Sequence, residues 1–367
     1  GPNGTPYRAG YHGPYGVAKA HELMLRFHQP QDHDVAERAV FFNQPCHLMT
    51  SPGHFAGSKA AGIITPLTPD KYTAIDKVIA ETMDFITAEK EHRGWYGLMD
   101  YGDIMIAYYS DIDHWAYDDG GYAWLNTEES VDHGLWLSAL RAGRPDWLAA
   151  AIDMSRHNRD VDVCHRGLFK GTGSRHNVNH WGDADKEWRI SMPLVRRFHY
   201  YVTADPWTAE CIDDTVAVFQ SYTRTAKTGP NMTSALAGIF TKWEMHHNRT
   251  DELTLRRLAD GFAKAVRPDG QFTYKLHANL TTGQSEPVGG EVHTLASFFI
   301  NTFGGQHTLV ETAELLNHKP LSDALVRHAD FWMGQKRTSL HVMVFVAHAY
   351  RVTGNRKYLD AMKKAFR

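Results

Sequence analysis

The stretch Val202-Thr203-Ala204-Asp205-Pro206-Trp207 is a tight polar turn between two segments with helical periodicity. A small residue such as Ala204 suits the left-handed position that ends many helices. Asp205 followed by Pro206 favours the start of a new helix, because aspartate caps the first turn and proline fits its first position. The stretch therefore predicts an αα-hairpin, two antiparallel helices joined by a short loop.

Turns of the same kind recur about every 50 residues, which is typical of repeated helix pairs. Each turn has Gly, Asn or Ala where one helical pattern ends and Asp, Asn, Pro or Thr where the next begins. The other four are 141–147, 246–251, 317–321 and 352–358. This repetition predicts a mainly α fold, an (α/α)6-type toroid of helix hairpins in which an inner ring lines a cavity and an outer ring surrounds it.

The periodic segments predict about twelve helices. Their expected spans are 70–92, 121–142, 145–158, 185–203, 206–223, 231–248, 250–267, 291–304, 307–317, 320–334, 338–353 and 355–366. The short turns would then lie at one end of the toroid. We expect the long connections, 93–120, 159–184 and 268–290, to lie together at the other end.

Residues 1–65 have a different pattern, in which Leu23, Leu25 and Phe27 alternate with other residues. Such alternation is typical of strands. We expect this part to be a strand-rich N-terminal segment at the edge of a β-domain. Residues 66–367 are expected to form the toroid and to carry the catalytic site.

The composition, 43% hydrophobic and 22% charged, is that of a globular protein. A net charge of -3 provides no basic face for nucleic acid or an anionic membrane, so we expect neither as a partner. The chain is rich in rings, with 23 His, 10 Trp, 16 Tyr and 17 Phe. Aromatic faces stack on the C–H faces of sugars while polar groups bind hydroxyls, so the composition favours a carbohydrate ligand.

The chain opens on Gly1-Pro2-Asn3-Gly4, without an initiator Met or a signal peptide. We expect a processed product or a piece of a longer chain that is secreted or periplasmic. Cys46, Cys164 and Cys211 fit no zinc pattern and define no disulfide framework.

Four polar, aromatic segments lie at the expected mouths of helices, at 94–103, 120–126, 175–183 and 289–293. Functional groups concentrate on loops that a scaffold holds in place, so we expect one composite site. The expected substrate-binding residues are Trp95, Tyr96, Asp103, Trp124, Asn177, Asn179, Trp181, Asp183, Glu291 and His293.

Elimination across a uronic acid requires a base for the C5 proton, a cation or amide for the carboxylate, and an acid for the departing oxygen. The segment 175–183 holds two His, one Arg and two Asn, which fits this requirement better than that of a two-acid hydrolase. Tyrosines of the neighbouring segments could supply the acid. The catalytic candidates are His176, His180, Tyr101, Tyr122 and Arg175.

His176 and His180 are four residues apart, the spacing of two metal ligands on a helix. Gly173 and Gly182 flank them and favour a loop, and no HExxH motif is present, so we predict no metal site. Their other interpretation is structural, as imidazoles that anchor a loop to backbone carbonyls. We expect no cofactor, while a calcium requirement stays open.

The carboxylates leave a second function open. Glycoside hydrolysis uses two facing acids, which could be two of Asp100, Asp103, Asp183 and Glu291. Each also has an ordinary interpretation, since Asp183 suits a helix cap and Glu291 the first turn of a helix.

Three stretches carry a resemblance to a known family. They are 15–22, 94–103, and 175–183 before a helix that ends in a Tyr-Tyr-x-Thr-x-Asp turn. Together they resemble the exo-acting rhamnogalacturonan lyase-like family. This resemblance implies an (α/α) toroid with attached β-domains of a longer parent chain, and β-elimination on a rhamnose-uronate polysaccharide.

Three functions follow in order of preference. The first is a polysaccharide lyase acting on an acidic polysaccharide or oligosaccharide of uronic acid and a sugar such as rhamnose. The second is a glycoside hydrolase on the same scaffold. The third is a noncatalytic carbohydrate-binding domain.

Overall fold

The structure is a computed structural model that describes residues 15–31, 33–43, 47–68, 71, 73–116, 124–125, 127–128, 130–174, 186–221, 223–292, 304–335 and 340–366. Its main elements are helix pairs that follow one another along the chain. The helices of these pairs are α2 (Pro52–Ser58), α3 (Thr73–Arg93), α4 (Val131–Ala142), α5 (Pro145–Asp160), α6 (Arg196–Thr203), α7 (Pro206–Gln220), α8 (Thr233–His246), α9 (Arg249–Ala265), α11 (Gly305–Leu315), α12 (Lys319–Met333), α13 (Met343–Thr353) and α14 (Arg356–Ala365).

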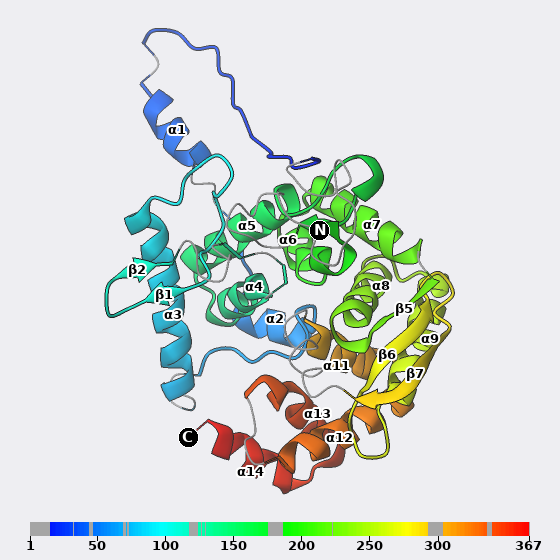
Figure 1. Cartoon of the computed structure of the whole chain (residues 1–367). Coiled ribbons are helices and arrows are strands. Elements are labelled where there is room, and N and C mark those ends of the chain that lie inside the picture. The colour runs from blue at the N-terminus through cyan, green and yellow to red at the C-terminus, as the bar shows by residue number, and fades with distance from the viewer. Residues whose placement is uncertain are drawn as a thin grey trace.

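The helices form two rings. Figure 1 shows α4, α8 and α11 toward the middle of the molecule, with α3, α5, α7, α9, α12 and α14 around them. Five inner helices, α4, α6, α8, α11 and α13, each lead through a short turn to an outer helix. The short helix α2 precedes the outer helix α3 in the chain and packs against α4. The expected (α/α) toroid is confirmed.

Burial distinguishes the rings. All nine residues 233–241 of α8 are buried, because this inner helix has neighbours on every side. The outer helix α9 instead buries one stripe that includes Leu255, Leu258 and Phe262 and leaves Arg257 at the surface. Spacing of three and four residues places such a stripe on one helix face.

The short turns have the capping that their sequences predict. Each of the five short turns contains a residue with positive φ, such as Ala204 at 54° and Gly143 at 67°. Four of the helices that follow begin at a side-chain cap, as where Asp205 accepts a hydrogen bond from the backbone N–H of Trp207, whereas α5 begins at Pro145 without one. Asn248 and Asn355 cap α9 and α14 in the same way. Local sequence therefore fixes where each helix pair turns.

A three-stranded antiparallel sheet lies where a long loop was expected. Its strands are β5 (Thr223–Lys227), β6 (Thr273–Asn279) and β7 (Ser285–Val292), in the order β5-β6-β7. β7 packs along the outside of α9, where Gly261 leaves room for Ser285. The expectation of a helix beginning at 291 is wrong, since Glu291 and Val292 end β7; residues 293–303 lie outside the described residues.

Two further helix boundaries differ from the expected ones. The span 185–203 is divided into β4 (Lys186–Glu187), a 3₁₀ turn (Trp188–Ser191) and α6. Pro193 explains the division, because a proline disfavours helical backbone at the residue before it. The described part of 121–130 is not helical, and α4 starts after Ser130, which has a φ of 55°.

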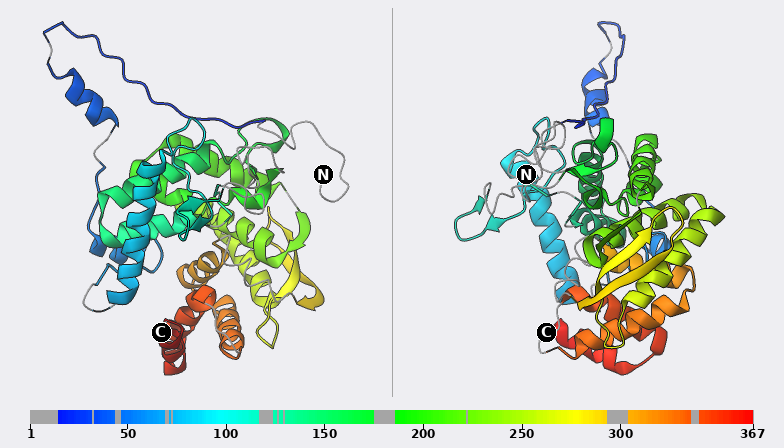
Figure 2. Two further views of the ribbon diagram at one scale, coloured as in Figure 1. Left: turned by 60° about the vertical axis from the view of Figure 1, so that its left-hand side comes forward. Right: turned by 45° about the vertical axis from the view of Figure 1, so that its right-hand side comes forward.

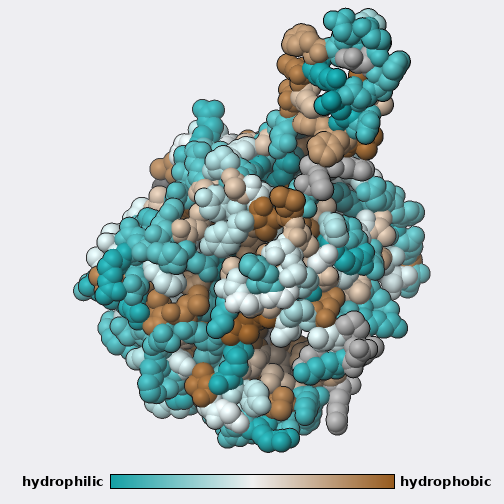
Figure 3. Space-filling view, turned by 180° about the vertical axis from the view of Figure 1, so that it is seen from behind, coloured by the Kyte–Doolittle hydropathy of each residue, from teal (hydrophilic) through white to brown (hydrophobic). Residues whose placement is uncertain are grey.

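The prediction of a strand-rich N-terminal segment is wrong for its described residues, which form two helices, α1 (Val35–Asn43) and α2, and no strand. Asp34 favours a helix here, because its carboxylate precedes α1 and accepts hydrogen bonds from Arg38 and Arg26. The extended residues before α1 project from the toroid as an arm (Figure 2). Apolar side chains appear on its surface (Figure 3), and Leu23 and Phe27 are 86% and 99% exposed.

The described residues also form two short hairpins, two further 3₁₀ turns (Gly167–Phe169 and Leu340–Val342) and a π-helical turn (Thr228–Met232). β1 (Tyr108–Tyr109) pairs with β2 (His114–Trp115), and β3 (Gly173–Ser174) pairs with β4. Within the described ranges, no helix has the length and apolar character needed to cross a membrane.

Candidate functional site

Nine of the predicted site residues lie outside the described residues, and their roles stay predictions. They are Tyr122, Arg175, His176, Asn177, Asn179, His180, Trp181, Asp183 and His293. The described residues that flank them still show where the segments carrying them begin and end.

The flanks of three such segments meet at the first turns of inner helices. β3 and β4 pair directly, so the two ends of the segment 175–185 lie side by side. Gly304, which follows 293–303, lies so close to Leu194, Met192 and Ser130 that a Cβ there would be 3.1 to 3.7 Å from them. Ser130 precedes α4, Leu194 precedes α6 and Gly304 precedes α11.

A largely buried ion pair joins two of these flanks. The Arg189 guanidinium donates to Glu128 over 2.9 Å, and each side chain is only 13% exposed. The backbone carbonyl of Arg189 accepts from the Ser234 hydroxyl in the first turn of α8, at 3.0 Å. The mouth of the inner ring is therefore braced by contacts between α8, the residues before α4 and the 3₁₀ turn before α6.

Two imidazoles are in contact, edge to face, at this mouth. His133 is the third residue of α4 and His307 the third residue of α11, and their ring centroids are 4.5 Å apart at 82°. The inner helices α6 and α8 separate α4 and α11 in chain order, so the contact spans the ring. His133 is buried against Phe198, whereas His307 is partly exposed.

Both imidazoles are held neutral. Burial lowers the pKa of His307 to about 4, and the nearby Arg197 lowers it further in the same direction. Burial, His307 and Arg197 lower the pKa of His133 well below its ordinary value. A neutral imidazole can accept a proton, so this pair has the charge state that a general base requires.

Below the imidazoles, Arg197 binds two glutamates. Its fully buried guanidinium donates to Glu244 of α8 and to Glu311 of α11, each over 2.8 Å. Tyr201, which is 40% exposed, donates its hydroxyl to the same Glu244 oxygen over 2.9 Å. Although burial disfavours a charged guanidinium, the two carboxylates raise the pKa of Arg197, so it stays cationic.

The N-terminal part of the chain reaches this cluster. Gly62 has a φ of 72°, and a Cβ there would be 2.9 Å from an oxygen of Glu311. Only glycine combines that backbone conformation with such a close approach. The segment after α2 therefore packs against the inner ring beside Glu311.

Tyr96 and Tyr101 lie elsewhere, beside the outer helices α3 and α5. The Tyr101 hydroxyl is 3.3 Å from both oxygens of Asp153 on α5, and Asp153 accepts from Lys90 of α3 at 2.5 Å. Burial and then Asp153 raise the pKa of Tyr101 to about 12. This position and these partners indicate a role on the outer helices and do not support the predicted catalytic role in the inner ring.

Asp103 was expected to bind substrate, but it is a buried structural residue. Its carboxylate is 3.1 Å from Nε2 of His157, and both side chains are fully buried. Burial alone would lower the pKa of His157, but Asp103 and Asp162 raise it to about 10. Asp103 is therefore engaged in an internal ion pair.

The predicted sugar platforms Trp95 and Trp124 are also internal. They are 5% and 4% exposed, and their rings meet edge to face with centroids 5.8 Å apart. Trp115 adds a third ring to Trp95 at 5.2 Å. Because these rings are buried against one another, they are not available to stack on a ligand and instead stabilise the packing of the residues between α3 and α4. Glu291, by contrast, is exposed at the end of β7.

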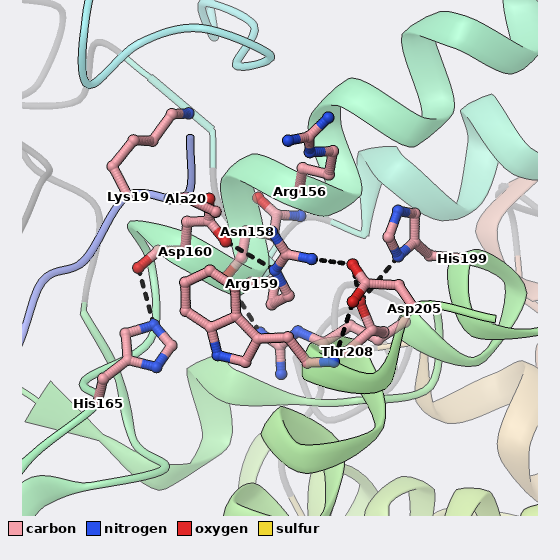
Figure 4. Close-up of polar contacts among 12 residues, drawn as sticks. Lys19, Ala20, Arg156, Asn158, Arg159, Asp160, His165, His199, Asp205 and Thr208 are labelled. Carbon is pink, nitrogen blue, oxygen red and sulfur yellow. Dashed lines mark hydrogen bonds and ion pairs between the residues drawn. The ribbon is translucent and has the colours of Figure 1, made fainter. Parts of the chain in front are cut away.

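The segment 15–22, one of those that carry the family resemblance, is docked on the end of α5. The backbone N–H groups of Ala18 and Ala20 donate to the carbonyl and the side chain of Asp160, at 3.3 and 2.8 Å. Figure 4 shows Asp160 in a polar network with Arg159 and Asp205, the cap of α7. The segment thus has a structural role.

His133, His307 and Arg197 were not among the residues selected from the sequence. The available signal was positional, since each lies in the first turn of an inner helix, but the sequence does not show which first turns meet. Within the described ranges, no group of three or more His, Cys, Asp or Glu residues could hold a metal ion.

Comparison with known proteins adds two findings. Residues 45–353 match the family described as "PcRGLX-like protein C-terminal alpha/alpha toroid domain". The chain is 29% identical over 346 residues to a protein of Bacillus subtilis (strain 168) named "Uncharacterized protein YetA", a match that covers 87% of this chain and 39% of the relative. The chain thus spans about two fifths of the length of this curated relative.

Proposed function

Since the chain belongs to the family of PcRGLX-like protein C-terminal α/α toroid domains, as its resemblance to rhamnogalacturonan lyase-like proteins predicted, we propose that it is the catalytic domain of a polysaccharide lyase. Its substrate is an acidic polysaccharide of uronic acid and a neutral sugar such as rhamnose. The reaction is β-elimination in the mouth of the inner ring.

The neutral imidazole pair beside Arg197 is the observation that supports this proposal most. In β-elimination a base takes the C5 proton, the electron pair of the C–H bond forms the C4=C5 double bond, and the C4–O bond breaks while its oxygen takes up a proton. His307 is the described residue that suits the base, because it is neutral and partly exposed. A bound uronate would bring a negative charge close to His307 and raise its basicity toward the working pH.

The segment 175–183 supplies the remaining groups in this proposal. Arg175 with Asn179 would hold the uronate carboxylate, and Tyr122 would assist the departing oxygen. His176 and His180, the bases predicted from the sequence, are the alternatives to His307 for removal of the C5 proton. The flanks of this segment lie at the same inner-helix ends as His307, which supports one shared site.

A hydrolase is the second candidate, and one observation favours it. Glu244 and Glu311 accept from the same guanidinium, so two carboxylates lie close together in the inner ring. Burial raises the pKa of Glu311, which a general acid requires. Arg197, however, occupies both carboxylates and opposes that change.

The domain organisation and the location of the whole protein are a further proposal. Because the relative is much longer than the matched part, we propose that the toroid acts together with further β-domains of a longer parent chain. We also propose that the enzyme is secreted or periplasmic, where its polymeric substrate occurs.

A product screen tests the proposed reaction. The protein would be incubated with rhamnogalacturonan, polygalacturonate and neutral dextran, and each mixture assayed for new reducing ends and for the ultraviolet absorbance of a C4=C5 unsaturated uronate. The lyase predicts that both signals rise together on an acidic polymer. Reducing ends without absorbance would show hydrolysis, and polymer binding without either signal would show a noncatalytic domain.

Variants then test the base. His307→Ala should lower turnover about 10² to 10⁴-fold at an unchanged melting temperature, the usual effect of losing acid-base assistance. His277→Ala is the matched control, because this exposed histidine lies on β6. If His307→Ala keeps wild-type turnover while His176→Ala or His180→Ala abolishes it, the base lies in the segment 175–183 instead.

A further inference from the structure

Two tyrosines form an open aromatic surface on the outer helices. The Tyr96 and Tyr101 rings are 5.9 Å apart and inclined by 37°. Tyr96 is 49% exposed, and the neighbouring Leu98 is 66% exposed. The Trp95 and Trp124 rings are covered in the core, whereas Tyr96 is half-exposed beside the partly buried Tyr101.

Basic groups border these rings. The Lys90 ammonium is 4.7 Å from the centroid of Tyr101 and 5.6 Å from that of Tyr96. Lys19 lies 5.6 Å from the Tyr101 ring, and its ammonium donates to the backbone carbonyl of Tyr101 at 3.1 Å. Arg156 of α5 is 31% exposed and forms an ion pair with the exposed Glu22 at 3.4 Å, which a uronate would have to displace; Figure 4 shows Arg156 and Lys19 on the same side of the Asp160 network.

Acceptors complete the surface. Glu91 accepts the hydroxyl of Tyr96, and Asp153 lies beside Tyr101 and Lys90. A cavity that shares Lys90 and Asp153 with this surface, and is lined also by Trp95, measures only about 20 Å³. That volume suits one water molecule, so a larger ligand would have to lie across the rings and not inside the protein.

We propose that Tyr96 and Tyr101, with Lys90, Lys19 and Arg156 at their edge, form an accessory binding surface for an acidic saccharide chain, outside the inner-ring site. The rings would stack on the C–H faces of sugar units, the cations would attract uronate carboxylates, and Glu91 and Asp153 would accept hydroxyls. The identity of the saccharide rests on the proposed function. The loop that carries the two tyrosines also pairs with Trp124 through Met105.

The test is retention of the protein in native gels that contain rhamnogalacturonan, polygalacturonate or neutral dextran. Tyr96→Ala should weaken retention by the acidic polymers about 3- to 10-fold, the loss expected from one aromatic contact. Tyr96→Phe keeps the ring and loses only the hydroxyl, so it should be retained like the wild type. Tyr109→Ala is the matched control, because Tyr109 is an exposed tyrosine (43%) on the neighbouring hairpin.

The outcomes separate this proposal from the enzymatic one. His307→Ala should lose product formation and keep retention, while Tyr96→Ala should lose retention at an unchanged melting temperature. If the wild type is retained but forms no product, the accessory binding surface is supported and the lyase proposal is refuted. Equal retention of Tyr96→Ala and wild type, or loss of retention in Tyr96→Phe to the same extent, would overturn the stacking surface.

Discussion

Replacing Arg197 by methionine should destabilise the protein severely. Arg197 is fully buried and binds Glu244 and Glu311, whose side chains are only 13% and 10% exposed. Methionine fills a similar volume but leaves two poorly solvated carboxylates without their cation. Removing one partner of a buried ion pair typically costs about 3 to 5 kcal/mol, and here one cation serves two anions.

Urea unfolding followed by tryptophan fluorescence measures this cost. We expect Arg197→Met to lower the free energy of unfolding by about 3 to 5 kcal/mol. The triple variant Arg197→Met/Glu244→Gln/Glu311→Gln should recover most of the loss, because no buried charge then lacks a partner.

A single variant within about 1 kcal/mol of wild type would refute this reasoning, since that is the range of solvated ion pairs. A triple variant as unstable as the single one would also contradict it. The cost would then arise from the lost contacts of the guanidinium with the Phe198 and Phe240 rings and not from unpaired carboxylates.

Two further predictions concern the buried residues Asp103 and Trp124 between α3 and α4. His157 has a folded pKa of about 10 against an ordinary value of 6.5, so its contribution to the free energy of unfolding is complete below pH 6.5 and is lost as the pH rises toward 10. Asp103→Asn should flatten this decline of the free energy of unfolding with pH, measured by chemical denaturation from pH 6 to 10. A decline as steep as in the wild type would contradict the ion pair. Trp124→Ala should lower the free energy of unfolding by about 3 to 5 kcal/mol while leaving retention in acidic-polymer gels unchanged, because its ring is buried against Trp95; lost retention in a stable variant would restore Trp124 as a sugar platform.

The fold could be predicted because its signals are local. Ala204, Asp205 and Pro206 specify one turn through positive φ, side-chain capping and a fixed first helical position, and none of these depends on distant residues. Residues of the same kinds specify the turns of the other helix pairs. At Pro193 the helical sequence pattern continues across a residue that a helix interior does not accommodate, so the predicted helix 185–203 is wrong there.

The N-terminal segment shows why alternation alone is insufficient. Leu23, Leu25 and Phe27 have the period of a strand, but a strand requires a partner, and the described chain before residue 65 forms no sheet. Asp34 and Arg38 carried the local signal for α1, a carboxylate before a helix and a cation one turn later.

The candidate site was harder to predict because it depends on which helix ends meet. His133 and His307 are 174 positions apart in the sequence (307 minus 133), so no local sequence pattern indicates their contact. Residue type also misled, since Trp95 and Asp103 have the chemistry of sugar-binding residues but are engaged with Trp124 and His157. Exposure decides such roles, and exposure follows from the fold.

The measurement that tests the central claim most directly is solvent-oxygen incorporation during cleavage of a uronate-rhamnose polysaccharide. The reaction would be run briefly in water enriched in heavy oxygen and stopped with borohydride, which reduces each new reducing end before its oxygen exchanges with the solvent, and its products examined by mass spectrometry. Elimination takes no oxygen from water, so the lyase predicts unsaturated products one water lighter than hydrolysis products and free of label. Saturated products that carry the heavy oxygen at their new ends would contradict the account and establish a hydrolase.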